Sequence, residues 1–133
     1  MTDTQQATTI NNIGVTMFTV SDVDAAITFY TQKLGFELRA DVPFGPEGEN
    51  RWVEVAPPGS AARLSLNPPM QGAEAGHGSI GVETPDVRGE YARLSALGVD
   101  ADPPMEMPGA PLMFMMRDPD GNHLAVVEPL PQA

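Results

Sequence analysis

The sequence predicts an α+β protein in which a βαβββ module of about 64 residues occurs twice. Three observations predict this fold class. An apolar, strand-like run is followed by an amphipathic segment and then by further strand-like runs. The same order of elements begins again after a segment rich in proline and glycine. Both amphipathic segments end in Leu-Gly followed by an apolar residue, at residues 34–36 and 97–99.

The first module is predicted over about residues 12–67. Residues 13–20 are apolar and β-branched, as expected of a strand. The spacing of Ser21 and Asp24 predicts the start of a helix with Ser21 as its N-cap, and Gly35 predicts its end. The three strands that follow this helix are predicted at residues 36–41, 51–56 and 62–67.

Residues 68–77 contain proline, glycine and alanine without periodicity and are predicted to form a linker. The second module then covers about residues 78–129. Thr84 and Pro85 suit the N-cap and the first helical residue, and Gly98 predicts the end of this second helix. The extended segments of this module are predicted at residues 79–83, 99–101, 112–117 and 123–128, with a tight turn at 118–121.

Composition narrows the possible functions. The chain carries 18 acidic and 7 basic residues, and its net charge of −11 disfavours binding to nucleic acid. No apolar run approaches the ~20 residues of a membrane-spanning helix. Residues 1–11 form a polar tail without the features of a secretory signal. Cysteine is absent, which excludes disulfides and thiolate metal sites and fits a cytoplasmic location.

Alternation along the strands assigns side chains to the two faces of each predicted sheet. One set is apolar and is expected beneath the helices: Phe18, Val20, Val53, Val55, Leu64, Leu66, Ile80, Val82, Leu124 and Val126. The opposite set is mostly polar and is expected on the helix-free face: Met17, Thr19, Trp52, Glu54, Arg63, Ser65, Asn67, Ser79, Gly81, Glu83, His123 and Ala125. A ligand site is therefore expected on the helix-free face.

Several residues of the helix-free set are candidates for ligand contact, and each has a structural alternative. Trp52, the single tryptophan, can stack on a ligand or simply pack against the sheet. Arg63 can bind a ligand anion or pair with Glu54 across a hairpin. His123 can transfer a proton, bind a metal or lie at the solvent edge. Glu83 is a candidate general base, as are Glu54 and His123.

Methionine is abundant: the chain has eight, and five of them fall within residues 105–116. Thioether side chains fill irregular cores, and they also adapt to varied ligands. Met113 or Met115, whichever faces inward, is predicted to supply an apolar wall to the ligand site.

Two segments resemble the vicinal oxygen chelate superfamily, which includes glyoxalase I, bleomycin-resistance proteins, fosfomycin-resistance enzymes and extradiol dioxygenases. They are residues 19–38, TVSDVDAAITFYTQKLGFEL, and residues 117–128, RDPDGNHLAVVE. The resemblance extends over about residues 12–129. It implies that the two modules pair their curved mixed sheets into a trough that holds a small organic molecule. It also implies a homodimer.

Metalloenzymes of this superfamily place a His or Glu on the first and last strand of each module. Matched by motif spacing, these positions fall on Val15, Ser65, Ser79 and Ala125. Valine and alanine have no donor atom, and a serine hydroxyl is a weak ligand for Zn²⁺, Fe²⁺ or Mn²⁺. We therefore expect no metal and no other cofactor, with Ser65 serving as a ligand-contact residue instead.

These observations favour a metal-free protein that binds and sequesters a small organic molecule through Trp52, Arg63, Glu83 and His123. One alternative is a metal-independent lyase, isomerase or cyclase that uses Glu83, Glu54 or His123 as acid and base. A second alternative is a divalent-metal lyase or dioxygenase with displaced ligands. The sequence does not identify the ligand.

Overall fold

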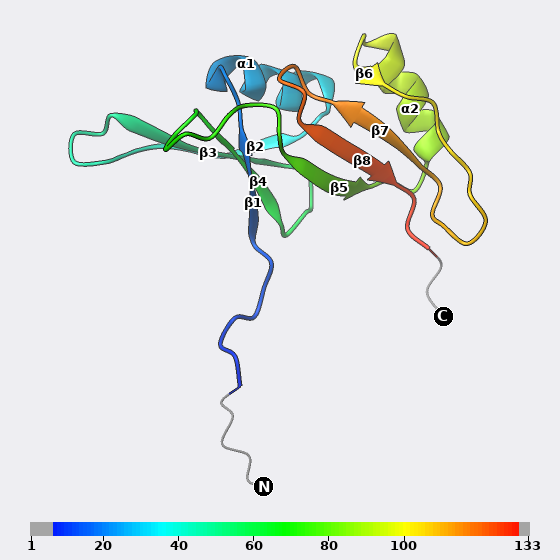
Figure 1. The fold of residues 1–133 in the computed structure, drawn as a ribbon, viewed down its shortest axis with the longest axis horizontal. Coiled ribbons are helices and arrows are strands. Elements are labelled where there is room, and N and C mark those ends of the chain that lie inside the picture. Colours follow the sequence, from blue (N-terminus) through cyan, green and yellow to red (C-terminus); the bar gives the residue numbers. More distant parts are fainter. Residues whose placement is uncertain (1–6, 131–133) are drawn as a thin grey trace, which may run out of the picture.

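The computed structural model describes residues 7–130 and contains two four-stranded sheets with short helices against them (Figure 1). The first module comprises β1 (Val15–Thr19), α1 (Val23–Thr28), the π-helical turn η1 (Phe29–Lys33), β2 (Glu37–Phe44), β3 (Asn50–Ala56) and β4 (Arg63–Asn67). The second comprises β5 (Ser79–Glu83), α2 (Val87–Ala96), β6 (Asp100–Ala101), β7 (Met113–Arg117) and β8 (His123–Val127). The predicted α+β class and the repeated βαβββ order are confirmed.

The two sheets share one topology. The first has the strand order β1-β4-β3-β2 and the second the order β5-β8-β7-β6. In each, the first strand runs parallel to the last, and the remaining pairs are antiparallel. Val15 lies opposite Arg63 in the first sheet, and Ser79 lies opposite His123 in the second. Val15 and Ser79 therefore occupy equivalent places, as the internal repeat predicts.

The N-cap of each helix is an aspartate, so the N-caps expected from the sequence are wrong. Asp22 caps α1 by accepting a hydrogen bond from the backbone N–H of Ala25 (3.1 Å), and Asp86 caps α2 through Gly89 (2.9 Å). The backbone N–H of Ser21 instead donates to Asp120, in the other module. The N–H of Thr84 donates to the carbonyl of Val127, because the chain still follows the sheet at that point.

The strand β2 is longer than predicted and contains a β-bulge. It continues to Phe44 because its last residues pair with β3. The register shifts between Leu38 and Ala40, so that Arg39 is the extra residue. The Arg39 guanidinium donates to the carbonyl oxygens of Pro57 (2.9 Å) and Ser60 (2.6 Å), and thereby holds the turn between β3 and β4.

The core lies between the sheets and the helices, which cover one side of both sheets (Figure 1). The predicted alternation is confirmed for most of the apolar set, because these side chains are buried: Phe18, Val20, Val53, Val55, Leu64, Leu66, Leu124 and Val126. Ile80 and Val82 differ. They pack against the core but stay partly exposed, because they line a cavity between the modules.

A buried polar network joins the modules at the turn between β7 and β8. The Asp118 carboxylate accepts hydrogen bonds from the Tyr30 hydroxyl (2.9 Å) and from the side-chain amide of Asn122 (3.0 Å). The same amide group of Asn122 donates to the carbonyl of Thr19 (3.1 Å), and its oxygen accepts from the N–H of Gly78 (2.8 Å). Tyr30 and Asn122 are fully buried. The network therefore fixes the first module against the second.

Because Tyr30 is buried, the free energy of unfolding is expected to fall at alkaline pH. Burial raises the pKa of Tyr30 well above its usual value near 10, and the neighbouring Asp118 carboxylate raises it further. The folded state therefore keeps this phenol protonated, whereas the unfolded chain ionises it near pH 10. The contribution of Tyr30 to stability is complete below about pH 10 and is lost progressively above that pH.

We expect the stability difference between wild type and Tyr30→Phe to shrink above about pH 10, because phenylalanine has no proton to lose. Urea unfolding from about pH 8 to about pH 11 measures this difference. Tyr91→Phe, at a partly exposed position on α2, is the matched control, and its difference from wild type should change less. A constant difference for Tyr30→Phe across this pH range would contradict the assignment.

Candidate functional site

Three side chains on β3 and β4 form a hydrogen-bonded triad on the helix-free face of the first sheet. The Trp52 indole N–H donates to one oxygen of Glu54 (2.8 Å), and the Arg63 Nε donates to the other (2.8 Å). The Glu54 side chain is only 13% exposed, compared with 36% for Arg63. The pairing of Arg63 with Glu54, one of the two alternatives that the sequence left open, is therefore present. We call these residues the Trp52 triad.

The neighbours of Trp52 along β3 show which face the triad occupies. Arg51 donates to Asp24 on α1 (2.9 Å) and to Asp41 on β2 (2.8 Å), so it points toward the helix. Val53 is fully buried in the core. Because side chains alternate along a strand, Trp52 and Glu54 point the other way. The strand alternation expected from the sequence is therefore correct for β3.

Exposed apolar side chains surround the triad on β1 and β2, and the sequence interpretation did not include most of them. Val42 lies opposite Trp52 in the β2–β3 ladder and is 49% exposed. Phe44, two residues further along β2, is 40% exposed, and Met17 on β1 is 59% exposed. The alternation of β2 beyond residue 41 is the signal that would have identified Val42 and Phe44. This face combines apolar area with a fixed polar centre.

Ser65 lies between the triad and β1. It pairs with Met17 on one side and with Glu54 on the other, and it is fully buried. Its hydroxyl accepts a hydrogen bond from the side-chain amide of Asn67 (3.0 Å). Ser65 is therefore covered by its neighbours on the helix-free face and does not project into solvent.

The second sheet carries the remaining candidates on its own helix-free face. Met113 and Met115 are half-buried and lie opposite Val127 and Ala125, so both have the orientation expected of an apolar wall. His123 is exposed and lies opposite Arg117, whose guanidinium is paired with two aspartates, Asp100 (2.8 Å) and Asp102 (2.9 Å).

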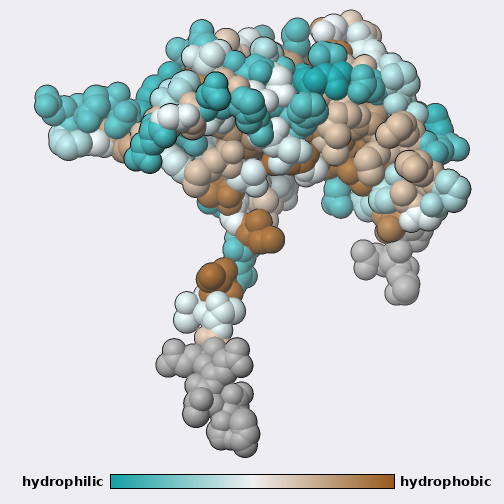
Figure 2. All heavy atoms as spheres, viewed as in Figure 1, coloured by the Kyte–Doolittle hydropathy of each residue, from teal (hydrophilic) through white to brown (hydrophobic). Residues whose placement is uncertain are grey.

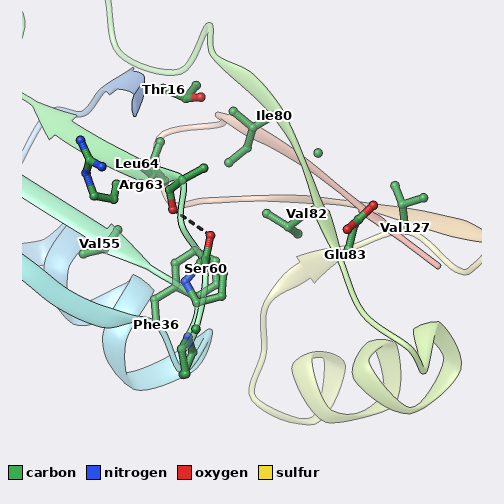
Figure 3. A pocket seen from close by; sticks show the side chains of 15 residues that line it. Thr16, Phe36, Val55, Ser60, Arg63, Leu64, Ile80, Val82, Glu83 and Val127 are labelled. Atoms are coloured by element: carbon green, nitrogen blue, oxygen red, sulfur yellow. Dashed lines mark hydrogen bonds between the residues drawn. The ribbon is translucent and has the colours of Figure 1, made fainter. Parts of the chain in front are cut away.

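A single chain does not gather these candidates into one cavity. Arg63 and Glu83 both line a cavity of about 590 Å³ between the modules (Figure 3). A second cavity, of about 420 Å³, lies beside Met17, Thr19 and the 73–78 segment. Within residues 7–130, Trp52, Met113, Met115 and His123 line neither cavity. The Trp52 triad is thus the one cluster of predicted residues in this range that direct contacts hold together.

The four positions that correspond to metal ligands offer no suitable donor set. Val15 and Ala125 are apolar, Ser65 is buried with its hydroxyl already bonded, and Ser79 is exposed. Over the part of the chain that the structure describes, no group of three or more His, Cys, Asp or Glu side chains is arranged to hold a metal ion. These residues therefore do not fit a divalent cation. Among the described helices, none is long and apolar enough to cross a membrane.

Comparison with known proteins gives consistent matches over nearly the whole chain. An uncharacterized Bacillus subtilis protein, YetH, is 38% identical over 117 residues, which cover 85% of this chain and 94% of that protein. The crystal structure of TnmS3, an antibiotic binding protein from Streptomyces sp. CB03234, is 34% identical with a TM-score of 0.83. The match covers 93% of this chain and 100% of that chain.

The crystal structure of a member of the glyoxalase/bleomycin resistance protein/dioxygenase superfamily from Sphaerobacter thermophilus is 32% identical with a TM-score of 0.82. The match covers 90% of this chain and 98% of that chain. The model of the Glyoxalase/Bleomycin resistance protein/Dioxygenase superfamily matches residues 12–126. The repeated βαβββ topology agrees with that match. The chain therefore belongs to the glyoxalase/bleomycin resistance protein/dioxygenase superfamily.

Proposed function

We propose that this protein binds an antibiotic-like aromatic molecule on the helix-free face of the first sheet and sequesters it without chemical change. The observation that carries the proposal is the Trp52 triad, a fixed polar centre within exposed apolar surface. Ligand sites commonly combine apolar walls with a few oriented polar groups. The similarity to TnmS3, described as an antibiotic binding protein, supports the same class of ligand.

The triad is suited to binding because its geometry is fixed before a ligand arrives. The bond to Glu54 fixes the Trp52 indole by its N–H edge, so the ring face remains the part that can stack on an aromatic ligand. Arg63 uses Nε for Glu54, and among the described residues its two terminal nitrogens have no hydrogen-bond partner. Those nitrogens can donate to an oxygen of the ligand. Preorganisation of this kind reduces the entropy lost on binding.

The same contacts make Glu54 a poor general base. Both carboxylate oxygens already accept hydrogen bonds, so Glu54 is engaged with Trp52 and Arg63 rather than with a substrate proton. Glu83 and His123 are exposed, and no hydrogen bond among the described residues joins either side chain to Glu54. The contacts therefore favour binding over acid–base catalysis.

The principal test is removal of the stacking surface. Trp52→Ala is expected to weaken binding of polycyclic aromatic antibiotics by about 1–3 kcal/mol, the usual range for a well-packed aromatic contact. Calorimetric titration of a panel of such antibiotics measures the change, because the variant has no tryptophan fluorescence. Trp52→Phe is the conservative control and should keep part of the affinity. Equal affinity of wild type and Trp52→Ala for every ligand that binds would refute the site.

Two further measurements separate binding from catalysis and test the role of Arg63. In wild type, quenching of Trp52 fluorescence should saturate, and mass spectrometry should recover the ligand unaltered. Recovery of a converted product would instead favour the lyase, isomerase or cyclase alternative. Arg63→Met keeps the apolar stem but removes the charge, so it should abolish any preference for ligands with an acidic group.

We also propose that the protein forms a homodimer that covers the helix-free faces. Figure 2 shows hydrophobic residues on the underside of the body and along the segment that leads to the N-terminus. The exposed apolar residues there include Ile10 and Ile13, which are 80% and 85% exposed. An apolar surface of this kind is characteristic of an interaction site. A second copy with its second sheet against this surface would bring an apolar methionine wall toward the Trp52 triad.

Light scattering at micromolar concentration is expected to give twice the chain mass of 14.1 kDa. Phe44→Asp, which places a charge on the exposed apolar surface of β2, should shift the protein toward monomer. Leu97→Asp is the matched control, because Leu97 is 44% exposed but lies at the end of α2, on the helix-covered side. It should leave the dimer intact. A wild-type protein of 14.1 kDa would contradict the dimer.

A further inference from the structure

A cavity between the two modules has no role in the proposed function. It has a volume of about 590 Å³. In Figure 3, Phe36 and Leu64 of the first module and Ile80 and Val82 of the second extend from opposite sides of this space. A smaller cavity of about 170 Å³ shares Phe36, Pro57, Pro58 and Val82 with it. We call the two adjoining cavities the inter-module cleft.

The inter-module cleft and the Trp52 side chain lie on opposite faces of the first sheet, and Arg63 borders both. Val55 and Leu64, which line the cleft, are buried and belong to the helix-covered face of the first sheet. Trp52 and Glu54 alternate with Val53 and Val55 along β3 and point to the opposite face. A ligand in the cleft would therefore contact the sheet from the other side.

One wall of the cleft is built from a braced turn. The turn at residues 57–60 presents Pro57 and Pro58 to the cavity, and proline has little conformational freedom to lose on binding. Arg39 binds the carbonyls of Pro57 and Ser60, and the Ser60 hydroxyl donates to the carbonyl of Ala62 (2.8 Å), as the dashed line in Figure 3 marks. These hydrogen bonds hold the 57–60 turn in place before any ligand binds.

The charges around the cleft disfavour an anion. Arg63 is the basic residue of the lining, and its charge is already balanced by Glu54. Glu83 and Glu90 add two carboxylates, of which Glu90 is paired with Arg93 (2.7 Å). The terminal nitrogens of Arg63 can still donate hydrogen bonds, but its charge is offset by Glu54 and that of Arg93 by Glu90, so Glu83 leaves the surroundings negative. An anionic group brought there would be desolvated beside like charge. The apolar walls, which include Phe36 and Val82, suit an uncharged ring system.

We propose that the inter-module cleft is a second binding site, which takes uncharged, flat aromatic molecules and excludes their anionic counterparts. The site requires apolar walls and the braced 57–60 turn, and it does not use Trp52 or Glu54. Arg63 is the one member of the Trp52 triad in its lining.

The test uses two fluorescent probes that differ by one charged group. N-phenyl-1-naphthylamine is uncharged, and 8-anilino-1-naphthalenesulfonate has the same ring system with a sulfonate. The uncharged probe should show a saturable fluorescence increase with the full-length protein. The sulfonate should bind at least about tenfold more weakly, because the charge of Arg63 is offset by Glu54 and the Glu83 carboxylate of the lining repels an anion. Failure of the uncharged probe to bind, or tighter binding of the sulfonate, would overturn the proposal.

Matched substitutions locate the probe. Val82→Phe fills the cleft and should weaken the uncharged probe by about tenfold or more, which corresponds to about 1.4 kcal/mol. Val42→Phe makes the same change on the helix-free face of the first sheet and should leave this probe unaffected. Thr16→Phe, at an exposed position of the lining, repeats the test in case Val82→Phe does not fold.

Trp52→Ala separates this proposal from the proposed function. It should weaken the antibiotic-like ligand and leave the uncharged probe unchanged. If Trp52→Ala or Val42→Phe abolishes probe binding while Thr16→Phe and Val82→Phe do not, the probe occupies the helix-free face and the cleft assignment is wrong. If antibiotics fail to bind wild type but the probe pattern holds, the cleft stands without the proposed function.

Discussion

Replacing Asn122 by alanine is expected to lower the free energy of unfolding by about 3–5 kcal/mol. Asn122 is fully buried, and its side-chain amide contacts three groups from different parts of the chain. It donates to Asp118 and to the carbonyl of Thr19, and it accepts from the N–H of Gly78. Alanine would leave each of these groups without that partner, and an unsatisfied buried polar group costs about 1–3 kcal/mol.

Urea unfolding at neutral pH measures the effect of Asn122→Ala. Asn11→Ala, at an exposed position before β1, is the matched control and should change stability by less than about 0.5 kcal/mol. The Thr19 and Asp118 contacts lie in different modules, so the variant should also loosen one module against the other. A loss below about 1 kcal/mol for Asn122→Ala would mean that water or local rearrangement replaces these bonds.

Replacing Phe18 by alanine is expected to lower the free energy of unfolding by about 3–5 kcal/mol, the range typical of large cavities in packed cores. The Phe18 side chain is 1% exposed. It also packs against Gly78 of the second module so closely that a β-carbon at residue 78 would lie 2.4 Å from the ring. The substitution therefore removes core volume at the contact between the modules.

Phe44→Ala removes the same number of atoms from a side chain that is 40% exposed, so it is the matched control. It should cost less than about 1.5 kcal/mol in folding because little cavity is created. Denaturant unfolding at a protein concentration where both variants are monomeric compares them, because loss of a dimer would otherwise lower the apparent stability of Phe44→Ala. Equal losses for Phe18→Ala and Phe44→Ala would contradict the assignment of Phe18 to the core and Phe44 to the surface.

The architecture and the strand faces were accessible from the sequence because they depend on local periodicity. Alternation along β3 and β4 is enough to separate Val53 from Trp52 and Leu64 from Arg63. The pairing of Arg63 with Glu54 was also within reach, since both belong to neighbouring strands of one hairpin. Both inferences use short separations along the chain.

Other features depend on contacts that local sequence does not encode. Ser21 and Asp22 are both good capping residues, and the choice of Asp22 follows from the contact of Ser21 with Asp120, far away in the chain. The bulge at Arg39 and its bonds to the 57–60 turn have no periodic signal. The inter-module cleft is likewise formed by how two modules meet, which strand alternation does not specify.

The two hairpin turns that follow β3 and β7 occupy equivalent places in the repeat but have diverged in chemistry. The first, held by Arg39, borders the inter-module cleft, whereas the second carries the buried Asp118 network. A symmetrised protein encoded by two tandem copies of residues 12–67 would therefore lack the acidic turn and the asparagine that join its halves. The two halves have become complementary parts, and neither is now a substitute for the other.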